Sequence, residues 1–203
     1  MSPLAVSLLV VCLLAVLLLV AAAPGFAAGK KLKSFEPELL LNPFLSPAYA
    51  QWLVGPIARI ADEDEAEAYL RLTDDTQAAA FIEAFWQKRD PDPQQPGNPL
   101  RDTFDQRVAD ADRLYSEGAY AGHHTDRGTI YVLYGEPESL DYDVAPYEGG
   151  PPIHIWRYPK KAPAGLDGRE PSQSYRFIKH GDLTVFYTQR LARPDRPLPP
   201  RLP

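Results

Sequence analysis

The sequence has a single cysteine among its 203 residues, and this residue, Cys12, lies in an apolar N-terminal run. One thiol forms no intramolecular disulfide, so a disulfide framework and a zinc site built on cysteines are both excluded. Basic residues are also scarce: 21 lysines and arginines stand against 27 acidic residues, for a net charge of −6. Because a nucleic-acid-binding protein needs a basic surface to neutralise phosphates, we expect no nucleic-acid partner.

The sequence also lacks the short motifs that identify common catalytic and cofactor sites. It has no G-x-S-x-G nucleophile elbow, no H-E-x-x-H metal motif, and neither of the phosphate-binding patterns G-x-x-x-x-G-K-[ST] and G-x-G-x-x-G. The sequence therefore does not favour a common serine hydrolase, zinc protease, nucleotide enzyme or dinucleotide oxidoreductase. We expect no cofactor and assign no catalytic residue.

The N-terminus is rich in apolar side chains. Residues 2–29 contain no Lys, Arg, Asp or Glu, and residues 4–20 are nearly all Leu, Val and Ala. A run of this kind followed by small residues is typical of a secretory signal peptide, and Gly25-Phe26-Ala27 favours cleavage after Ala27. Alternatively, residues 4–23 are long enough to span a bilayer as an anchor. Residues 1–29 are therefore predicted to be a signal peptide or an N-terminal membrane anchor.

These features favour an extracytoplasmic location, in the periplasm or outside the cell, with membrane contact only through the N-terminal segment. One observation opposes this prediction. Lys30, Lys31 and Lys33 follow the apolar run instead of preceding it. If the run stays uncleaved, the positive-inside rule would then hold the rest of the chain in the cytoplasm.

Proline is in excess, with 22 among 203 residues where about 5% is usual. Prolines interrupt residues 30–49, which we expect to form an extended lead-in. Residues 191–203 contain five prolines and three arginines and have too little apolar periodicity to fold, so a disordered Pro-rich tail is predicted. One folded domain is expected between these segments, over residues 50–190.

Three helices are predicted in the first half of this domain. One begins at Asp62, with Glu65 three residues later as a capping box. A second begins at Asp74, and a third begins at Asn98, where the following proline suits the first helical position. The second helix has apolar residues at helical spacing, at Ala78, Phe81, Ile82, Phe85 and Trp86.

The second half changes to a strand pattern. β-branched and aromatic residues fill 129–134, and residues 153–158 alternate between two faces. Residues 175–178 and 183–188 flank a short polar turn, which predicts a β-hairpin. Helices followed by strands indicate an α+β fold, with N-terminal helices packed on a small, mainly antiparallel sheet of about four strands.

Several segments, covering residues 50–187, resemble bacterial GWxTD-domain proteins. The resemblance lies in the helix-plus-loop stretch from Phe81 to Pro91, in Thr125-Asp126-Arg127-Gly128, and in the later strands around Ile155 and Tyr175. It implies a domain of unknown function that often carries an export signal. The name-giving motif is Gly122-His123-His124-Thr125-Asp126 here, so His123 stands where the family has Trp.

The candidate binding residues are Arg89, Asp90, Thr125, Asp126 and Arg127. For the segment that starts at Thr125 we prefer a turn, in which Asp126 bonds backbone N–H groups and Gly128 takes a positive φ. Alternatively, Asp126 and Arg127 face a cleft and bind a polar partner. For Arg89 we prefer an ion pair with Asp126 that ties the helices to the sheet.

His123 and His124 are adjacent, and His is a common metal ligand. Neighbouring residues in an extended loop point to opposite sides, however, so one ion would not reach both side chains. The resemblance implies Trp at the first of these positions, and Trp ligates nothing. We therefore predict a surface loop and no metal site.

The leading interpretation is a non-enzymatic binding or interaction module of the cell envelope, whose partner is a protein or another envelope component. The alternative is a small carboxylate-dependent hydrolase that acts on an envelope polymer or glycan. Glycoside chemistry needs two carboxyl groups about 5–9 Å apart, and the available pairs are Asp126 with Asp102, Asp105 or Glu136. A membrane-tethered scaffold is a third interpretation and depends on an uncleaved N-terminus.

Overall fold

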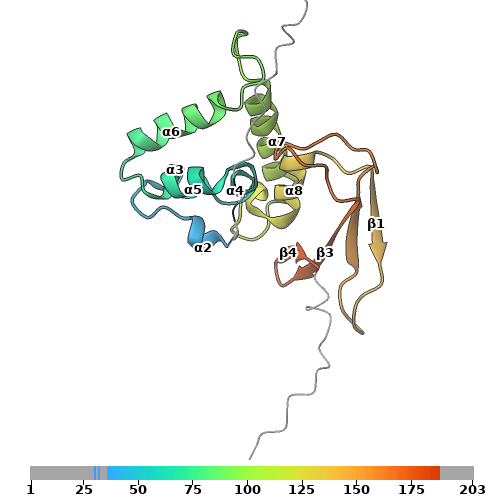
Figure 1. The fold of residues 1–203 in the computed structure, drawn as a ribbon. Coiled ribbons are helices and arrows are strands. Elements are labelled where there is room, and N and C mark those ends of the chain that lie inside the picture. The colour runs from blue at the N-terminus through green and yellow to red at the C-terminus, as the bar shows by residue number, and fades with distance from the viewer. Residues whose placement is uncertain (1–29, 31, 33–35, 188–203) are drawn as a thin grey trace, which may run out of the picture.

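The computed structural model describes residues 30, 32 and 36–187 (Figure 1). Over these residues it contains seven α-helices, one 3-10 turn and a four-stranded sheet. The predicted signal peptide or anchor at 1–29 and the predicted tail at 191–203 lie outside the described residues. None of the described helices is long and apolar enough to cross a membrane.

Short helices occupy the chain before residue 61. α2 (Pro37–Leu40), α3 (Pro47–Ala50) and α4 (Pro56–Ile60) each begin with proline, whose fixed φ and missing N–H suit the first helical turn. Leu40 and Leu45 are buried, so the lead-in packs on the core. It is partly helical, and not extended throughout, because its prolines start helices as well as ending them.

The next two helices begin where the sequence predicts. At α5 (Glu63–Leu70), the N–H of Glu65 donates to the Asp62 carboxylate at 2.8 Å, and the N–H of Asp62 donates to the Glu65 carboxylate at 2.9 Å. At α6 (Asp75–Gln87), the Asp74 carboxylate accepts from the N–H of Gln77 at 2.9 Å. Both predicted caps are therefore confirmed.

Two further helices lie between the N-terminal helices and the sheet (Figure 1). α7 (Pro99–Tyr115) has the predicted cap, since Asn98 accepts from the first N–H groups. The 3-10 turn η1 (Gly122–His124) follows, and then α8 (Asp126–Tyr134). The prediction of a strand over 129–134 was wrong, and so was the turn with a positive φ at Gly128.

The burial of α8 explains this error. Residues 128–130, 132 and 133 are all buried, because α8 contacts α4, α7 and β4. A helix that is covered on most sides carries apolar residues around most of its surface, and its β-branched and aromatic residues then resemble a strand. The helix starts because the Thr125 hydroxyl accepts from the N–H of Gly128 at 3.1 Å.

The sheet is an antiparallel meander in the order β1-β2-β3-β4, which confirms the α+β prediction. Its strands are β1 (Ser139–Asp143), β2 (Ile153–Arg157), β3 (Ser174–His180) and β4 (Leu183–Phe186). The predicted hairpin is β3–β4, with Gly181 at φ 61° in its turn. The strand β1 was not predicted. Its Leu140 and Tyr142 are exposed while its acidic residues are half-buried, the reverse of the usual pattern.

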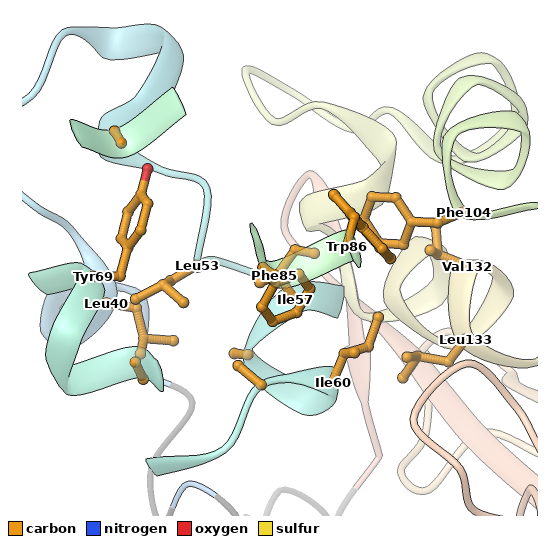
Figure 2. Packing of buried hydrophobic residues seen from close by; sticks show 14 of the residues in the cluster. Leu40, Leu53, Ile57, Ile60, Tyr69, Phe85, Trp86, Phe104, Val132 and Leu133 are labelled. Atoms are coloured by element: carbon orange, nitrogen blue, oxygen red, sulfur yellow. The ribbon is translucent and has the colours of Figure 1, made fainter. Parts of the chain in front are cut away.

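Two hydrophobic clusters connect these layers. The larger runs from Leu40 and Leu53 in the N-terminal part, through Phe85 of α6, to Val132 and Leu133 of α8 (Figure 2). The smaller lies between α8 and the sheet and consists of Ile130, Trp156, Tyr158 and Phe177. Three tyrosines pack against both clusters, namely Tyr115, Tyr131 and Tyr134. The helices and the sheet therefore share aromatic side chains from α7 and α8.

Candidate functional site

Arg89 pairs with Glu65. Its Nη2 lies 2.5 Å from Glu65 Oε2, its Nη1 donates to Glu65 Oε1 at 2.9 Å, and the two side chains are 12% and 13% exposed. The predicted Arg89–Asp126 pair was wrong, because the C-terminal end of α6 lies against the start of α5, whereas Asp126 lies beside the sheet. Burial by itself would raise the pKa of Glu65, but hydrogen bonds from Arg89 and Lys88 outweigh it and lower the pKa to about 2.

Asp90 starts the loop after α6. Its carboxylate accepts from the N–H of Asp92 at 3.0 Å, the local bond by which aspartate often begins a turn. α6 has already ended at Gln87, and Pro91, which has no backbone N–H, cannot continue it. The contact at Asp90 therefore closes a turn.

Thr125 holds η1 against the start of α8. Its hydroxyl donates to the carbonyl of Gly122 at 2.8 Å and also caps α8. The backbones come very close here. A Cβ at Gly122 would lie 1.9 Å from the carbonyl oxygen of Ala111, and a Cβ at Gly128 would lie 1.8 Å from that of Gly122. The two glycines therefore allow α7, η1 and α8 to pack backbone to backbone.

Asp126 joins α8 to β4. Its Oδ2 accepts from the N–H of Phe186 at 2.6 Å. Burial raises the pKa of Asp126, and the charge of Glu117 adds to this, while the N–H of Phe186 and the charge of Arg59 act in the opposite direction. Glu117 is thus the acid whose charge acts on Asp126. The predicted partners for an acid pair were Asp102, Asp105 and Glu136.

Arg127 is connected to the sheet through Glu117. It forms an ion pair with Glu117, whose other oxygen accepts from the N–H of Thr184 at 2.5 Å. Thr184 and Phe186 alternate in β4 with residues that bond inward to β3, so their N–H groups point to the outer edge of the sheet. Glu117 and Asp126 therefore satisfy two donors on an edge that would otherwise be open.

The five predicted residues thus separate into two groups. Arg89 and Asp90 stabilise the helical part, while Thr125, Asp126 and Arg127 attach α8 to its neighbours. A role for any of them in ligand binding stays a prediction. Sequence reasoning missed Glu117, which follows α7 in a short irregular segment and carries no local signal of its contact with a strand 67 residues away.

His123 and His124 lie beside a pocket. Their ring centroids are 4.0 Å apart, so the prediction of opposite orientations was wrong, because η1 is a 3-10 turn and not an extended loop. The Asp112 carboxylate accepts from the backbone N–H of His123 at 2.9 Å and lies 2.7 Å from Nδ1 of its ring. Burial lowers the pKa of His124 to about 4, and His123 adds to this shift.

The pocket has a volume of about 290 Å³ and is open to solvent. Its walls are mostly apolar, and the lining residues are Pro47, Ala48, Gln51, Trp52, Val54, Pro56, Ile57, Phe104, Val108, His123 and His124. Neither Asp126 nor Glu117 lines it. In the described part of the chain, no group of three or more His, Cys, Asp or Glu side chains is placed to hold a metal ion.

Comparisons with known proteins give one match. Neither the curated proteins nor the solved structures contain a significant relative of this chain. The sequence profile of the GWxTD domain matches residues 39–162, which is more than half of the 203 residues and extends from α2 past β2. This chain therefore belongs to the GWxTD-domain family.

Proposed function

We propose that this protein is an exported, non-enzymatic module of the cell envelope that binds a protein or another envelope component. The charge-free apolar run over residues 2–29 supports export. The polar side chains of the motif support a structural role for that segment, since Thr125, Asp126 and Arg127 all contact other parts of the protein. Among the described residues, the pocket beside His123 has no acidic residue in its lining, so it gives the hydrolase alternative no support.

The proposal is supported by a difference between the two edges of the sheet. On β4, side-chain carboxylates bind the outward N–H groups of Thr184 and Phe186. At the other edge, β1 exposes Leu140 and Tyr142 on one face, with Val144 directly after the strand. These side chains are 61%, 66% and 80% exposed. Exposed apolar residues along an edge strand favour a docking surface for another chain, because edge strands pair readily with an added strand.

The test is site-specific crosslinking in cells that express the full chain. A photo-crosslinking residue in place of Tyr142 is expected to give a discrete covalent adduct. The same residue in place of the exposed Glu67 on α5 should not give it. Protease treatment of cells with a permeabilised outer envelope is expected to degrade the protein without access to the cytoplasm. Identical adducts at both positions, no adduct at Tyr142, or full protection from the protease would contradict the proposal.

A further inference from the structure

The pocket beside His123 is small and mostly apolar. Trp52, Ile57, Phe104 and Val108 come from three separate parts of the chain and form its apolar walls. Its volume of about 290 Å³ lies at the lower limit of ligand pockets, which span about 300–1,000 Å³. This volume suits a single ring system and is too small for a dinucleotide or a haem.

The family motif indicates which ring system would fit this pocket. In the GWxTD domain the residue after the motif glycine is Trp, and in this chain that residue is His123. An imidazole is smaller than an indole and is held on Asp112 through its Nδ1 atom at 2.7 Å. The chain therefore lacks an indole at a position that lines an apolar pocket and that carries an indole in the family.

His123 is also one of the few polar residues among those that line the pocket. A carboxylate only accepts hydrogen bonds, so the Nδ1 atom that faces Asp112 carries the proton. In the neutral ring Nε2 is then an acceptor, and an indole N–H is a donor only. Leucine or isoleucine would fill apolar space equally well but would offer no donor to this nitrogen.

We propose that the pocket binds a tryptophan side chain of a partner polypeptide, which takes the place of the tryptophan that the family carries at position 123. The proposal rests on the proposed function only in that the protein binds another polypeptide. Its residues belong to α3, α4, α7, η1 and the segment between α3 and α4, and not to β1. The two proposals therefore concern different surfaces, and their tests fail on different results.

The test uses fluorine NMR on the full chain labelled with 5-fluorotryptophan. The chain has three tryptophans: Trp52 lines the pocket, Trp86 packs on the pocket residue Phe104, and Trp156 is buried in the smaller cluster as an internal control. Titration with N-acetyl-tryptophanamide is expected to shift the Trp52 resonance saturably, with a Kd of order 1 mM for a ligand of this size. The Trp156 resonance should stay in place, and N-acetyl-leucinamide should bind at least about tenfold more weakly.

The variant His123→Trp fills the pocket from within and should weaken binding of the probe by about tenfold or more. His180→Trp makes the same change at the exposed end of β3 and should leave the titration unchanged. If His123→Trp does not fold, Ala48→Leu narrows the pocket at an exposed position and should weaken binding several-fold. No saturable shift at Trp52, equal binding of the leucine amide, or unchanged binding in these pocket variants would overturn the proposal. Crosslinking at Tyr142 does not depend on any of these results.

Discussion

Asp126 joins two parts of the chain that are 60 residues apart. Its carboxylate lies at the first position of α8 and accepts a hydrogen bond from the N–H of Phe186 in β4. At its position in α8 the carboxylate also interacts favourably with the positive end of the helix dipole. One side chain thus contributes to both the start of a helix and the edge of a sheet.

Replacement of Asp126 by Ala is expected to lower the free energy of unfolding by about 1–3 kcal/mol, because the N–H of Phe186 loses its buried acceptor. Asp126→Asn should cost less, since the amide oxygen still accepts. Urea unfolding measures both losses, and hydrogen exchange at the Phe186 amide should accelerate in the Ala variant. An Ala variant as stable as the wild type would show that the bond contributes nothing.

Arg89 is a second residue whose contact decides stability. Arg89→Met leaves the carboxylate of Glu65 in a half-buried site with Lys88 as its remaining cation, and a loss of about 3 kcal/mol is expected. The control is Arg71→Met, which removes an exposed pair with Glu67 and should change stability by less than about 1 kcal/mol. Equal losses in the two variants would contradict the importance of burial at Glu65.

At the scale of elements, α8 depends on close approach more than on helix propensity. Its Gly128 lies in the first turn, where the backbone of η1 leaves no room for a Cβ. The flanking residues favour a strand by type, yet the Thr125 cap and burial on most sides produce a helix. The element is therefore stabilised by its neighbours.

Gly128→Ala is expected to lower the free energy of unfolding by about 2–4 kcal/mol, since overpacking outweighs the roughly 1 kcal/mol that Ala gains over Gly in a helix. Gly168→Ala places the same methyl group in open space and should cost only the strain of a positive φ, about 1 kcal/mol. Thermal or urea unfolding of the two variants compares them. A more stable Gly128→Ala variant would contradict the close contact between η1 and α8.

At the scale of the whole molecule, His124 and Glu65 both make the protein less stable at acid pH. His124 has a folded-state pKa of about 4, below its ordinary value of 6.5. The unfolded chain therefore binds a proton first, so stability is full above pH 6.5 and falls as the pH drops toward 4. Glu65 adds a second loss between its ordinary value of 4.5 and about 2. Asp126 acts in the opposite sense, because its raised pKa favours the protonated folded state.

The free energy of unfolding is thus expected to fall by about 1–2 kcal/mol between pH 7 and pH 4 through His124, allowing for its partial exposure to solvent. His124→Gln should flatten this part of the curve, whereas His180→Gln, at an exposed position, should not. Urea unfolding at pH 7, 5.5 and 4 gives the comparison. A pH dependence that is unchanged in His124→Gln would exclude this residue as its source.

The sequence by itself determined the α+β order, the caps at Asp62, Asp74 and Asn98, and the β3–β4 hairpin. Each of these depends on groups within a few residues of one another, so the local sequence contains the whole signal. Tertiary structure alone decided that residues 126–134 form a helix, that Arg89 pairs with Glu65, and that Glu117 and Asp126 close the edge of β4. These outcomes depend on burial and on partners 24 to 67 residues away, and no local pattern encodes them. The pocket beside His123 belongs to the second group, because its walls meet only after α3, α4, α7 and η1 have packed together.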